Sequence, residues 1–300
     1  MARDKMKRKK IIITGAYGQL GSECRKIMSA AYDVYPFSKK ELDIRDMDRV
    51  NSVVGDIRPH VILNCAAYTD VDGAESNKDI AEEVNVKGVA NLARAASNYG
   101  AKIIHISTDY VFDGRKEIPK AYTEYDQPSP ISVYGDTKLE GEEQVRNICH
   151  NYIILRTGWV YGLHGKNFPK TILKLSLKKD TPLKVVDDQY GSPTWAKSIA
   201  LQIQVMIKNE LTGIYHATSE GYCSWYEFAK FLLEAIGIKK EVIPCSSEEF
   251  KRPAKRPKNS ILENYQLKFR SLNIMPFWKY AFLAFLREEG ERFKNSIEFM

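Results

Sequence analysis

The chain has 300 residues, of which 44% are hydrophobic and 28% are charged, a composition typical of a soluble globular protein with one large domain or two smaller ones. Its formal net charge is +7, but six Lys and Arg residues and one Asp stand among the first ten residues, so much of the excess lies in a tail and not on a nucleic-acid-binding surface. The longest apolar runs are too short to cross a bilayer, and the N-terminus has no signal-peptide core, which together predict a cytoplasmic protein.

Short apolar strands alternate with helical segments in the first half of the chain. Strands are predicted at 10–14, 32–37, 60–66, 101–108 and 152–157, and helices at 18–30, 46–57, 79–100 and 131–148, with a loop at 113–130. The strands are mostly apolar throughout and do not alternate with polar residues, so both faces of their sheet should be covered. This order predicts an α/β fold with a doubly wound parallel sheet and right-handed crossovers.

The pattern is looser beyond Gly158. Helices are predicted at 167–179, 195–208, 224–236 and 275–294, strands at 183–187, 213–217 and 240–244, and a proline-rich loop at 250–260. We infer a first domain over 1–160, joined by a segment of roughly 183–208, and a smaller α/β part over 161–300.

Cysteine and histidine spacing argues against a disulfide framework and against a metal centre. The five cysteines include no C-x-x-C pair, and the five histidines include no H-E-x-x-H pattern. We expect the cysteines to be small buried hydrophobes, and the sequence assigns no metal ligand. The cysteines are Cys24, Cys65, Cys149, Cys223 and Cys245.

Three glycines follow the first strand and open the first helix. Gly15, Gly18 and Gly21 are three residues apart in IIITGAYGQLGSE. Glycine allows a tight turn and a close approach of a pyrophosphate, and the free N–H groups of a helix start attract that anion. An ordinary glycine-rich turn would contain the same residues, but the position between a strand and a helix favours a dinucleotide site. The first domain is therefore predicted to bind a dinucleotide.

The end of the second strand bears on the choice of nicotinamide cofactor. An acidic residue there would favour NAD by bonding the adenosine ribose. The sequence instead reads FSKK, in which Ser38, Lys39 and Lys40 offer a hydroxyl and two cations to a 2′-phosphate. This favours NADPH, with NADH as the alternative, because lysines exposed on a turn would look the same.

A tyrosine and a lysine stand one helical turn apart in ISVYGDTKLEGE, where Tyr134 and Lys138 can meet on one helix face. Carbonyl reduction needs a hydride delivered to carbon and a proton delivered to the developing alkoxide. A free phenol has a pKa of about 10, and a nearby ammonium stabilises the phenolate and lowers that pKa. The pair is therefore predicted to supply the proton of a reductase, with the lysine also bonding the nicotinamide ribose.

A third polar group is expected beside this pair. IHISTDYVFDG places Ser107 and Thr108 at the C-terminal end of a strand, where ligands of open parallel sheets bind. A hydroxyl at that edge would position the carbonyl oxygen. The tyrosine-lysine spacing alone is common, but chance is a poor explanation for that spacing together with the glycine turn and the strand-end hydroxyls, all in this order.

Longer stretches resemble one family. The G-x-x-G-x-x-G turn is similar to that of the short-chain dehydrogenase/reductase superfamily, and from about residue 9 to the C-terminal helix the chain resembles its dTDP-4-dehydrorhamnose reductases. The resemblance implies an extended short-chain fold, Rossmann-type, whose smaller part binds substrate. It also implies reduction of the 4-keto group of dTDP-4-dehydro-L-rhamnose by NAD(P)H, giving dTDP-L-rhamnose for bacterial surface polysaccharide. The matching stretches include NCAAYTDVDGAE (64–75), STDYVFDG (107–114), SPISVYGDTKLEGE (129–142), LRTGWVYG (155–162), VVDDQYGSPTWA (185–196) and RPKNSIL (256–262).

The resemblance also implies roles for single residues. Tyr134 resembles the proton donor, Lys138 its partner and Thr108 the third catalytic residue, and Asp109 and Trp159 would contact the sugar nucleotide. The implied cofactor contacts are Gly18, Gln19 and Leu20 along the pyrophosphate, Asp43 and Ile44 at the adenosine, and Ala67, Tyr68 and Thr69 along the cofactor, beside Gly15, Gly21, Tyr134 and Lys138.

Several of these residues have plainer interpretations. Trp159 is also what a hydrophobic core would contain, and Asp72 and Glu75 suit a helix start. Arg252 and Arg256 would clamp a diphosphate or belong to a solvated basic loop.

Neighbouring functions are weighed by the residues that follow Thr108. Sugar-nucleotide dehydratases resemble the chain but typically have Asp-Glu there, whereas Asp109 is followed by Tyr110. Related epimerases and a non-catalytic dinucleotide-binding regulatory subunit stay as alternatives. Some reductases of the family dimerise through magnesium held by glutamates, and only Glu23 falls at a matching position, so magnesium is not assigned and the chain is expected to be a monomer or homodimer.

Overall fold

One parallel sheet of six strands forms the centre of the protein in a computed structural model that describes residues 8–178 and 181–296. The strand order is β2-β1-β3-β4-β5-β10, and every neighbouring pair is parallel. The carboxyl ends of these strands therefore lie along one edge. The strands are β1 (Lys10–Thr14), β2 (Asp33–Phe37), β3 (Val61–Asn64), β4 (Lys102–Thr108), β5 (Tyr152–Thr157) and β10 (Gly213–His216). Most of the basic tail lies outside the described residues.

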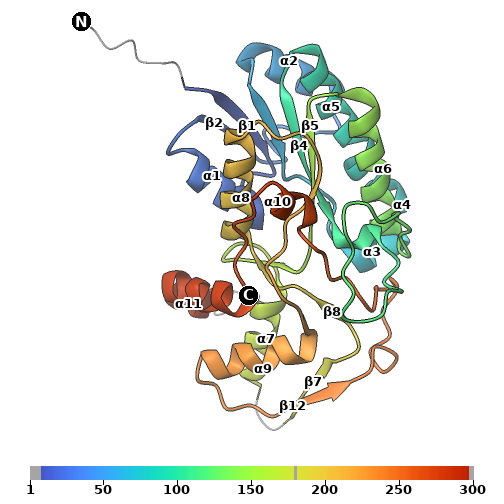
Figure 1. Ribbon diagram of the computed structural model, residues 1–300, viewed down its shortest axis with the longest axis vertical. Coiled ribbons are helices and arrows are strands. Elements are labelled where there is room, and N and C mark those ends of the chain that lie inside the picture. The colour runs from blue at the N-terminus through green and yellow to red at the C-terminus, as the bar shows by residue number, and fades with distance from the viewer. Residues whose placement is uncertain (1–7, 179–180, 297–300) are drawn as a thin grey trace, which may run out of the picture.

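Helices cover both faces of this sheet (Figure 1). Strand β1 shows why, since Ile11 and Ile13 pack into one hydrophobic core and Ile12 into the other. The predicted doubly wound parallel sheet is thereby confirmed. On the first face lie α1 (Gln19–Met28) and α8 (Ala196–Lys208), and on the second lie α2 (Met47–Ile57), α5 (Gly88–Asn98) and α6 (Val133–Ile148).

The helix predicted over 79–100 is broken into three pieces. A short helix α4 (Lys78–Glu82) passes through a π-helical turn η1 (Glu83–Lys87) into α5. Before it stands an additional helix, α3 (Val71–Ser76), whose N-cap Asp70 accepts from the backbone N–H of Gly73. The sequence prediction was wrong to treat 79–100 as one regular helix, because the π turn follows from tertiary contacts of Asn85 that helical spacing does not reveal.

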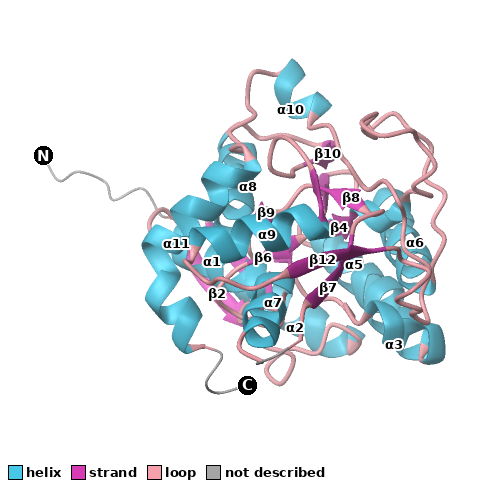
Figure 2. Ribbon diagram, turned by 90° about the horizontal axis from the view of Figure 1, so that it is seen from below, coloured by secondary structure: helices cyan, strands magenta, loops and turns pink. Residues whose placement is uncertain are grey.

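A second, smaller hydrophobic core lies beyond the carboxyl edge of the sheet. It is built largely from α7 (Phe168–Ser176), α9 (Trp225–Ala235) and α11 (Trp278–Asn295). Figure 2 views the molecule from this end. The remaining elements are the 3-10 turn η2 (Asp109–Val111), α10 (Tyr265–Phe269), and the strands β6 (Val160–Tyr161), β7 (Leu183–Val186), β8 (Tyr190–Gly191), β9 (Thr194–Trp195), β11 (Cys223–Ser224) and β12 (Val242–Cys245).

The chain passes between the two cores more than once. After β5 it enters the smaller part, where β7 pairs with β12, and then returns through α8 to add β10 beside β5. The division into 1–160 and 161–300, with a joining segment near 183–208, stays a prediction. Within that segment β7 lies outside the large sheet, whereas α8 packs on it.

Two further sequence expectations concern the whole chain. All five cysteines are free, and four of them are buried. No helix in the part of the chain that the structure describes is both long enough and apolar enough to cross a membrane.

Candidate active site

Close backbone contacts shape the glycine turn between β1 and α1. Gly15 has a φ of 61°, and a Cβ there would lie 2.7 Å from the Ala66 nitrogen. A Cβ at Gly21 would lie 2.2 Å from the Gly15 carbonyl oxygen. A Cβ at Gly18 would instead meet only that oxygen, at 3.4 Å, so the outer side of the turn is open. A compact turn with an open outer side at a helix start fits a pyrophosphate.

The side chains of the two residues after Gly18 make contacts away from the open side of the turn. Gln19 accepts a hydrogen bond from Nδ2 of Asn167 at 2.9 Å, which joins the turn to the smaller part of the chain. Leu20 is buried in the core between α1 and the sheet. Because both side chains are engaged in this way, contact with a pyrophosphate would fall to their backbone N–H groups.

The predicted adenosine contacts follow β2. Asp43 forms an ion pair with Arg45, in which Nη2 and Oδ2 are 2.6 Å apart, and hydrogen bonding from Arg45 lowers the pKa of Asp43. Lys39 is close enough to lower the same pKa further. Ile44 is buried, and its side chain would collide with a Cβ at Gly88. Lys39, Asp43 and Arg45 therefore form a polar group at the end of β2.

The segment Ala67–Thr69 follows β3 at the carboxyl edge. The backbone N–H of Tyr68 donates to Oδ1 of Asn85 at 2.9 Å, and Nδ2 of Asn85 donates to the Tyr68 carbonyl at 3.1 Å. Asn85 also donates to Oγ1 of Thr137 in α6 at 3.1 Å. The Asn85 side chain of the π turn therefore bonds both the loop after β3 and α6, the helix that carries Tyr134.

The phenol of Tyr134 stands beside the hydroxyl of Thr108. Burial raises the pKa of Tyr134 to about 12, and hydrogen bonding with Thr108 acts in the opposite direction. Oγ1 of Thr108 donates to Oδ1 of Asp109 at 2.9 Å and accepts from the Tyr110 N–H at 3.2 Å. Tyr134 is positioned by α6, whose N-cap Ser132 accepts from the Gly135 N–H.

Lys138 does not point at the phenol. Its Nζ donates to the Ile106 carbonyl at 2.6 Å and lies 3.3 Å from Nε2 of His105. Burial lowers the pKa of Lys138 to about 8. The expectation that an adjacent ammonium lowers the pKa of Tyr134 therefore does not hold in this structure, because the amine is turned towards β4 and burial of the phenol dominates.

The two hydroxyls at the end of β4 face different partners. Ser107 donates to the carboxylate of Glu142, which is paired with Arg156 in the interior. Thr108 is directed to Asp109 and Tyr134. Of the two hydroxyls in the predicted strand end, only Thr108 is therefore placed for chemistry at the phenol.

Asp109 is almost fully buried. Burial raises its pKa to about 6, and the hydroxyls of Ser260 and Thr108 limit that rise. The carboxyl fits against the backbone of residue 158 because that residue is glycine, where a Cβ would lie 2.7 Å from the Asp109 carboxyl carbon.

Trp159 is half-buried and has a φ of 51°, which is unusual for a residue other than glycine. Its ring stacks on Trp225 with centroids 3.3 Å apart, and its Nε1 donates to Oγ of Ser260 at 3.0 Å. Because Ser260 also acts on Asp109, the two predicted sugar contacts share this hydroxyl. Strained backbone of this kind is common at ligand sites.

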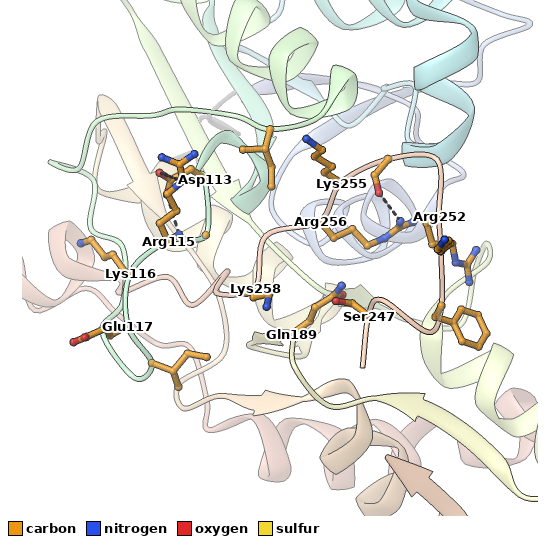
Figure 3. A pocket seen from close by; sticks show the side chains of 16 residues that line it. Asp113, Arg115, Lys116, Glu117, Gln189, Ser247, Arg252, Lys255, Arg256 and Lys258 are labelled. Carbon is orange, nitrogen blue, oxygen red and sulfur yellow. Dashed lines mark hydrogen bonds and ion pairs between the residues drawn. The ribbon is translucent and has the colours of Figure 1, made fainter. Parts of the chain in front are cut away.

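A basic cleft of about 780 Å³ lies between loop 113–118 and segment 250–258. Figure 3 shows Arg115 and Lys116 on one side, and Arg252, Lys255 and Arg256 on the other. The cleft also includes Lys251 and Lys258.

Arg256 connects this cleft to the ring of Tyr110, which lies beside Tyr134. Its Nη1 and Nη2 bind Oδ1 and Oδ2 of Asp72 at 3.1 Å and 2.8 Å. It also lies near Tyr110, whose ring meets that of Tyr134 at a centroid distance of 5.7 Å. Both sequence interpretations of Arg256 overlooked Asp72, which is an ion-pair partner as well as a first-turn acid of α3.

Three buried residues at the site were missed by sequence reasoning: Asn64, Asn85 and His105. Asn64 and His105 each interrupt an apolar run, and that contrast was the available signal, whereas Asn85 lies between two valines in the charged stretch EEVNVK and gave no such signal. His105, for example, interrupts the apolar part of the strand KIIHIST. Buried polar side chains usually have hydrogen-bond partners, as all three do here.

No metal centre is assigned. Within residues 8–178 and 181–296, no group of three or more His, Cys, Asp or Glu side chains is arranged to hold a metal ion. Glu23 is buried near Glu289, and burial raises the pKa of Glu23.

Comparison with known proteins identifies the family. The family model described as RmlD substrate binding domain matches residues 9–290. A dTDP-4-dehydrorhamnose reductase from Aggregatibacter actinomycetemcomitans is 42% identical over 268 residues, covering 85% of this chain and 90% of that protein. A dTDP-4-keto-6-deoxy-D-glucose reductase from Streptomyces niveus is 34% identical over 273 residues, covering 90% and 94%.

A solved structure gives the same result. The dTDP-4-dehydrorhamnose reductase from Bacillus anthracis str. Ames, in complex with NADP, is 43% identical and aligns with a TM-score of 0.90 over 94% of this chain and 99% of that one. The resemblance seen in the sequence is thus confirmed. This chain belongs to the dTDP-4-dehydrorhamnose reductase family.

Proposed function

We propose that this protein reduces the 4-keto group of dTDP-4-dehydro-L-rhamnose to a hydroxyl, with NADPH as the reductant and Tyr134 as the proton donor. The observation that carries the proposal is the phenol of Tyr134 beside the hydroxyl of Thr108, at the carboxyl end of β4. Ligands of open parallel sheets bind at that edge. The enzyme would act in the cytoplasm as a monomer or homodimer.

The dinucleotide would bind at the carboxyl edge between β1 and β3, where the strand order reverses. The open side of Gly18 and the N-terminus of α1 would hold its pyrophosphate. Lys39 and Lys40 would bind the 2′-phosphate of NADPH, and Asp43 the adenosine. When bound, this cofactor supplies the hydride to the carbonyl carbon. A relative with NADP bound supports the choice, and NADH stays the alternative.

Proton delivery falls to the side chains around Thr108. With its pKa near 12, Tyr134 is protonated at neutral pH, so it is ready to donate. As negative charge develops on the substrate oxygen, the phenol gives up its proton to that oxygen. Thr108 positions the same oxygen, and the ammonium of Lys138, once turned from β4 towards the phenol, would stabilise the phenolate that is left.

Substrate binding would involve the smaller part of the protein. The basic cleft suits the diphosphate of a sugar nucleotide, because Arg115, Lys255 and Lys258 add positive charge beside Arg256. Asp109 and Trp159 would contact the sugar nucleotide nearer to Tyr134. A second candidate substrate is dTDP-4-keto-6-deoxy-D-glucose, because a relative that is 34% identical is named for its reduction.

The test is the loss of reduced-nicotinamide absorbance with each keto-sugar, using NADPH and NADH in parallel. We expect NADPH-dependent turnover that falls by about 10²- to 10⁴-fold in Tyr134→Phe. Thr108→Val should lose about tenfold, because one hydrogen bond of about 1.4 kcal/mol corresponds to that factor. The matched control Thr108→Ser retains the hydroxyl and should stay near wild type.

Two results would contradict this proposal. Tight dinucleotide binding without turnover of either keto-sugar would reject the proposed reaction and favour a regulatory subunit. Full activity of Tyr134→Phe would reject the proton donor alone.

A further inference from the structure

A buried chain of hydrogen bonds leads from the glycine turn to Lys138. Thr14, the last residue of β1, donates to Oδ1 of Asn64 at 2.7 Å. Nδ2 of Asn64 lies 3.1 Å from Nδ1 of His105, and Nε2 of His105 lies 3.3 Å from Nζ of Lys138. All four residues are at most 2% exposed. The chain therefore links the dinucleotide turn to the proposed catalytic lysine without using solvent.

The orientation of the Asn64 amide is fixed by its neighbours. The backbone N–H of Ala66 also donates to Oδ1 of Asn64, at 3.1 Å. A backbone N–H is only a donor, so the amide oxygen must lie on that side. The NH₂ group of Asn64 must then face His105.

This orientation fixes the tautomer of His105. An amide NH₂ group is only a donor, so Nδ1 of His105 must accept and carries no proton. Burial lowers the pKa of His105 well below its usual value, which keeps the ring neutral. A neutral imidazole without a proton on Nδ1 carries it on Nε2. The Nε2–H of His105 therefore points at Lys138.

We propose that His105 is a positioning residue whose Nε2–H receives Lys138 as a neutral amine in the buried position and disfavours the ammonium there. An ammonium has donors and no acceptor, so it would meet the Nε2–H donor to donor, whereas a neutral amine can accept from it and still donate to the Ile106 carbonyl. The ammonium form of Lys138 is therefore favoured in a position away from His105.

Two other groups near Lys138 raise its pKa and so favour the ammonium form, in opposition to His105 and burial. The carboxylate of Glu142 favours the ammonium, but it is bound to Arg156 of β5 and to Ser107 of β4. Cys65, which follows β3, also favours it. Burial outweighs both and lowers the pKa of Lys138 to about 8.

The inference rests on the proposed function, because it assigns Lys138 to carbonyl reduction. Stabilising a phenolate at Tyr134 requires the ammonium. His105 would therefore separate a neutral amine at β4, which predominates above about pH 8, from a working ammonium on the side of the phenol. Asn64 sets this arrangement from the end of β3, beside the last residue of β1.

The tautomer can be measured without any turnover. In protein labelled with ¹⁵N-histidine, two-bond ¹H–¹⁵N correlations distinguish Nδ1–H from Nε2–H, and His105→Gln assigns the signal. We expect the Nε2–H form at His105. His216 is a matched internal control, because it is equally buried and its Nδ1 lies 3.2 Å from the Glu263 carbonyl, which only accepts and so requires Nδ1–H. An Nδ1–H signal from His105 would overturn the proposal.

Asn64→Asp tests the effect on Lys138. The carboxylate still accepts from Thr14 and Ala66, but its second oxygen now accepts from Nδ1 and should switch His105 to Nδ1–H. Nε2 then accepts from the ammonium, so the limb of the kcat-pH profile expected near pH 8 in wild type should move up by about 1 to 2 units. An unmoved limb after a switched tautomer would disprove the positioning role.

Two further variants cover the case in which Asn64→Asp does not fold. His105→Gln can still offer an N–H to Lys138 and an oxygen to Asn64, whereas His105→Leu can do neither. We expect the limb to stay in place for Gln and to rise for Leu, and equal profiles would refute the proposal. Absence of turnover in wild type would instead reject the proposed function, and the ¹⁵N signals would still decide the tautomer.

Discussion

The carboxylate of Glu142 and the guanidinium of Arg156 form an ion pair in the interior of the protein, with Oε2 and Nη2 2.7 Å apart and side chains only 1% and 3% exposed. Glu142 belongs to α6 and Arg156 to β5, and Ser107 of β4 donates to the same carboxylate. The pair therefore anchors the helix that carries Tyr134 to the two strands beside it.

Glu142→Gln should destabilise the protein by about 3–5 kcal/mol, because removing one partner of a buried pair leaves the other charge uncompensated. The free energy of unfolding from urea titrations of wild type and variant measures this loss. Glu82→Gln is the control. Its pair with Lys78 spans 3.3 Å on exposed α4, and such pairs contribute only about 0.2–0.5 kcal/mol. Equal losses in the two variants would contradict a structural role for the interior pair.

Two helical glycines should respond oppositely to alanine. A Cβ at Gly21 would lie 2.2 Å from the Gly15 carbonyl oxygen, whereas a Cβ at Gly290 in α11 would meet nothing within 4 Å. Gly21→Ala should cost about 1–3 kcal/mol by forcing the turn open, and it should weaken NADPH binding. Gly290→Ala should gain about 0.5–1 kcal/mol, since alanine is the better helix former. Thermal unfolding and NADPH titration measure both effects, and unchanged NADPH affinity in Gly21→Ala would argue against the turn as the pyrophosphate site.

Much of the fold was predictable because the large sheet is buried on both faces. The run Ile11–Ile13 places side chains alternately in the two cores, and only a doubly covered strand needs that composition. The π turn was not predictable in this way. It depends on Asn85 reaching Tyr68 and Thr137, two partners that only the folded chain brings together.

The same distinction applies to the candidate site, where local position was predictable and tertiary contacts were not. Tyr134 and Thr108 were predictable because a helix start and a strand end place them at one edge. The inward direction of Lys138 was not, because its partners His105 and Ile106 are more than thirty residues earlier in the chain. Periodicity places a residue on a helix face, but it does not determine which buried acceptor a long side chain will reach.

The lysines after β2 should determine cofactor preference. If Lys39 and Lys40 bind the 2′-phosphate, replacing both by alanine should raise the Kd for NADPH at least tenfold, since hydrogen bonds to charged groups contribute about 1.5–3 kcal/mol. The Kd for NADH should change little. Fluorescence titration with each cofactor measures both. The control Lys208→Ala with Lys239→Ala removes the same charge from exposed positions at α8 and after α9. A parallel loss for NADH would show a general electrostatic effect and reject the assignment.

Asp109 should make stability depend on pH in an unusual direction. Burial raises its pKa to about 6, above the value of about 4 expected in the unfolded chain. The folded state therefore binds this proton more tightly, so its contribution to stability is present below about pH 4 and is lost as the pH rises through about 6. Asp109→Asn removes the titration. Its stability relative to wild type should improve by roughly 3 kcal/mol between pH 3 and pH 7, since two pKa units correspond to that energy.

Urea unfolding of both proteins across this pH range measures the difference, and taking the difference cancels the other carboxylates. Asp113→Asn provides a control of opposite sign. Hydrogen bonding from the Arg115 backbone lowers the pKa of Asp113, so its contribution is present above about pH 4 and is lost as the pH falls. That variant should therefore lose stability relative to wild type as the pH rises. If the Asp109→Asn difference is flat with pH, Asp109 titrates alike in both states, and the buried carboxylate beside Thr108 is ionised throughout the range in which the enzyme is assayed.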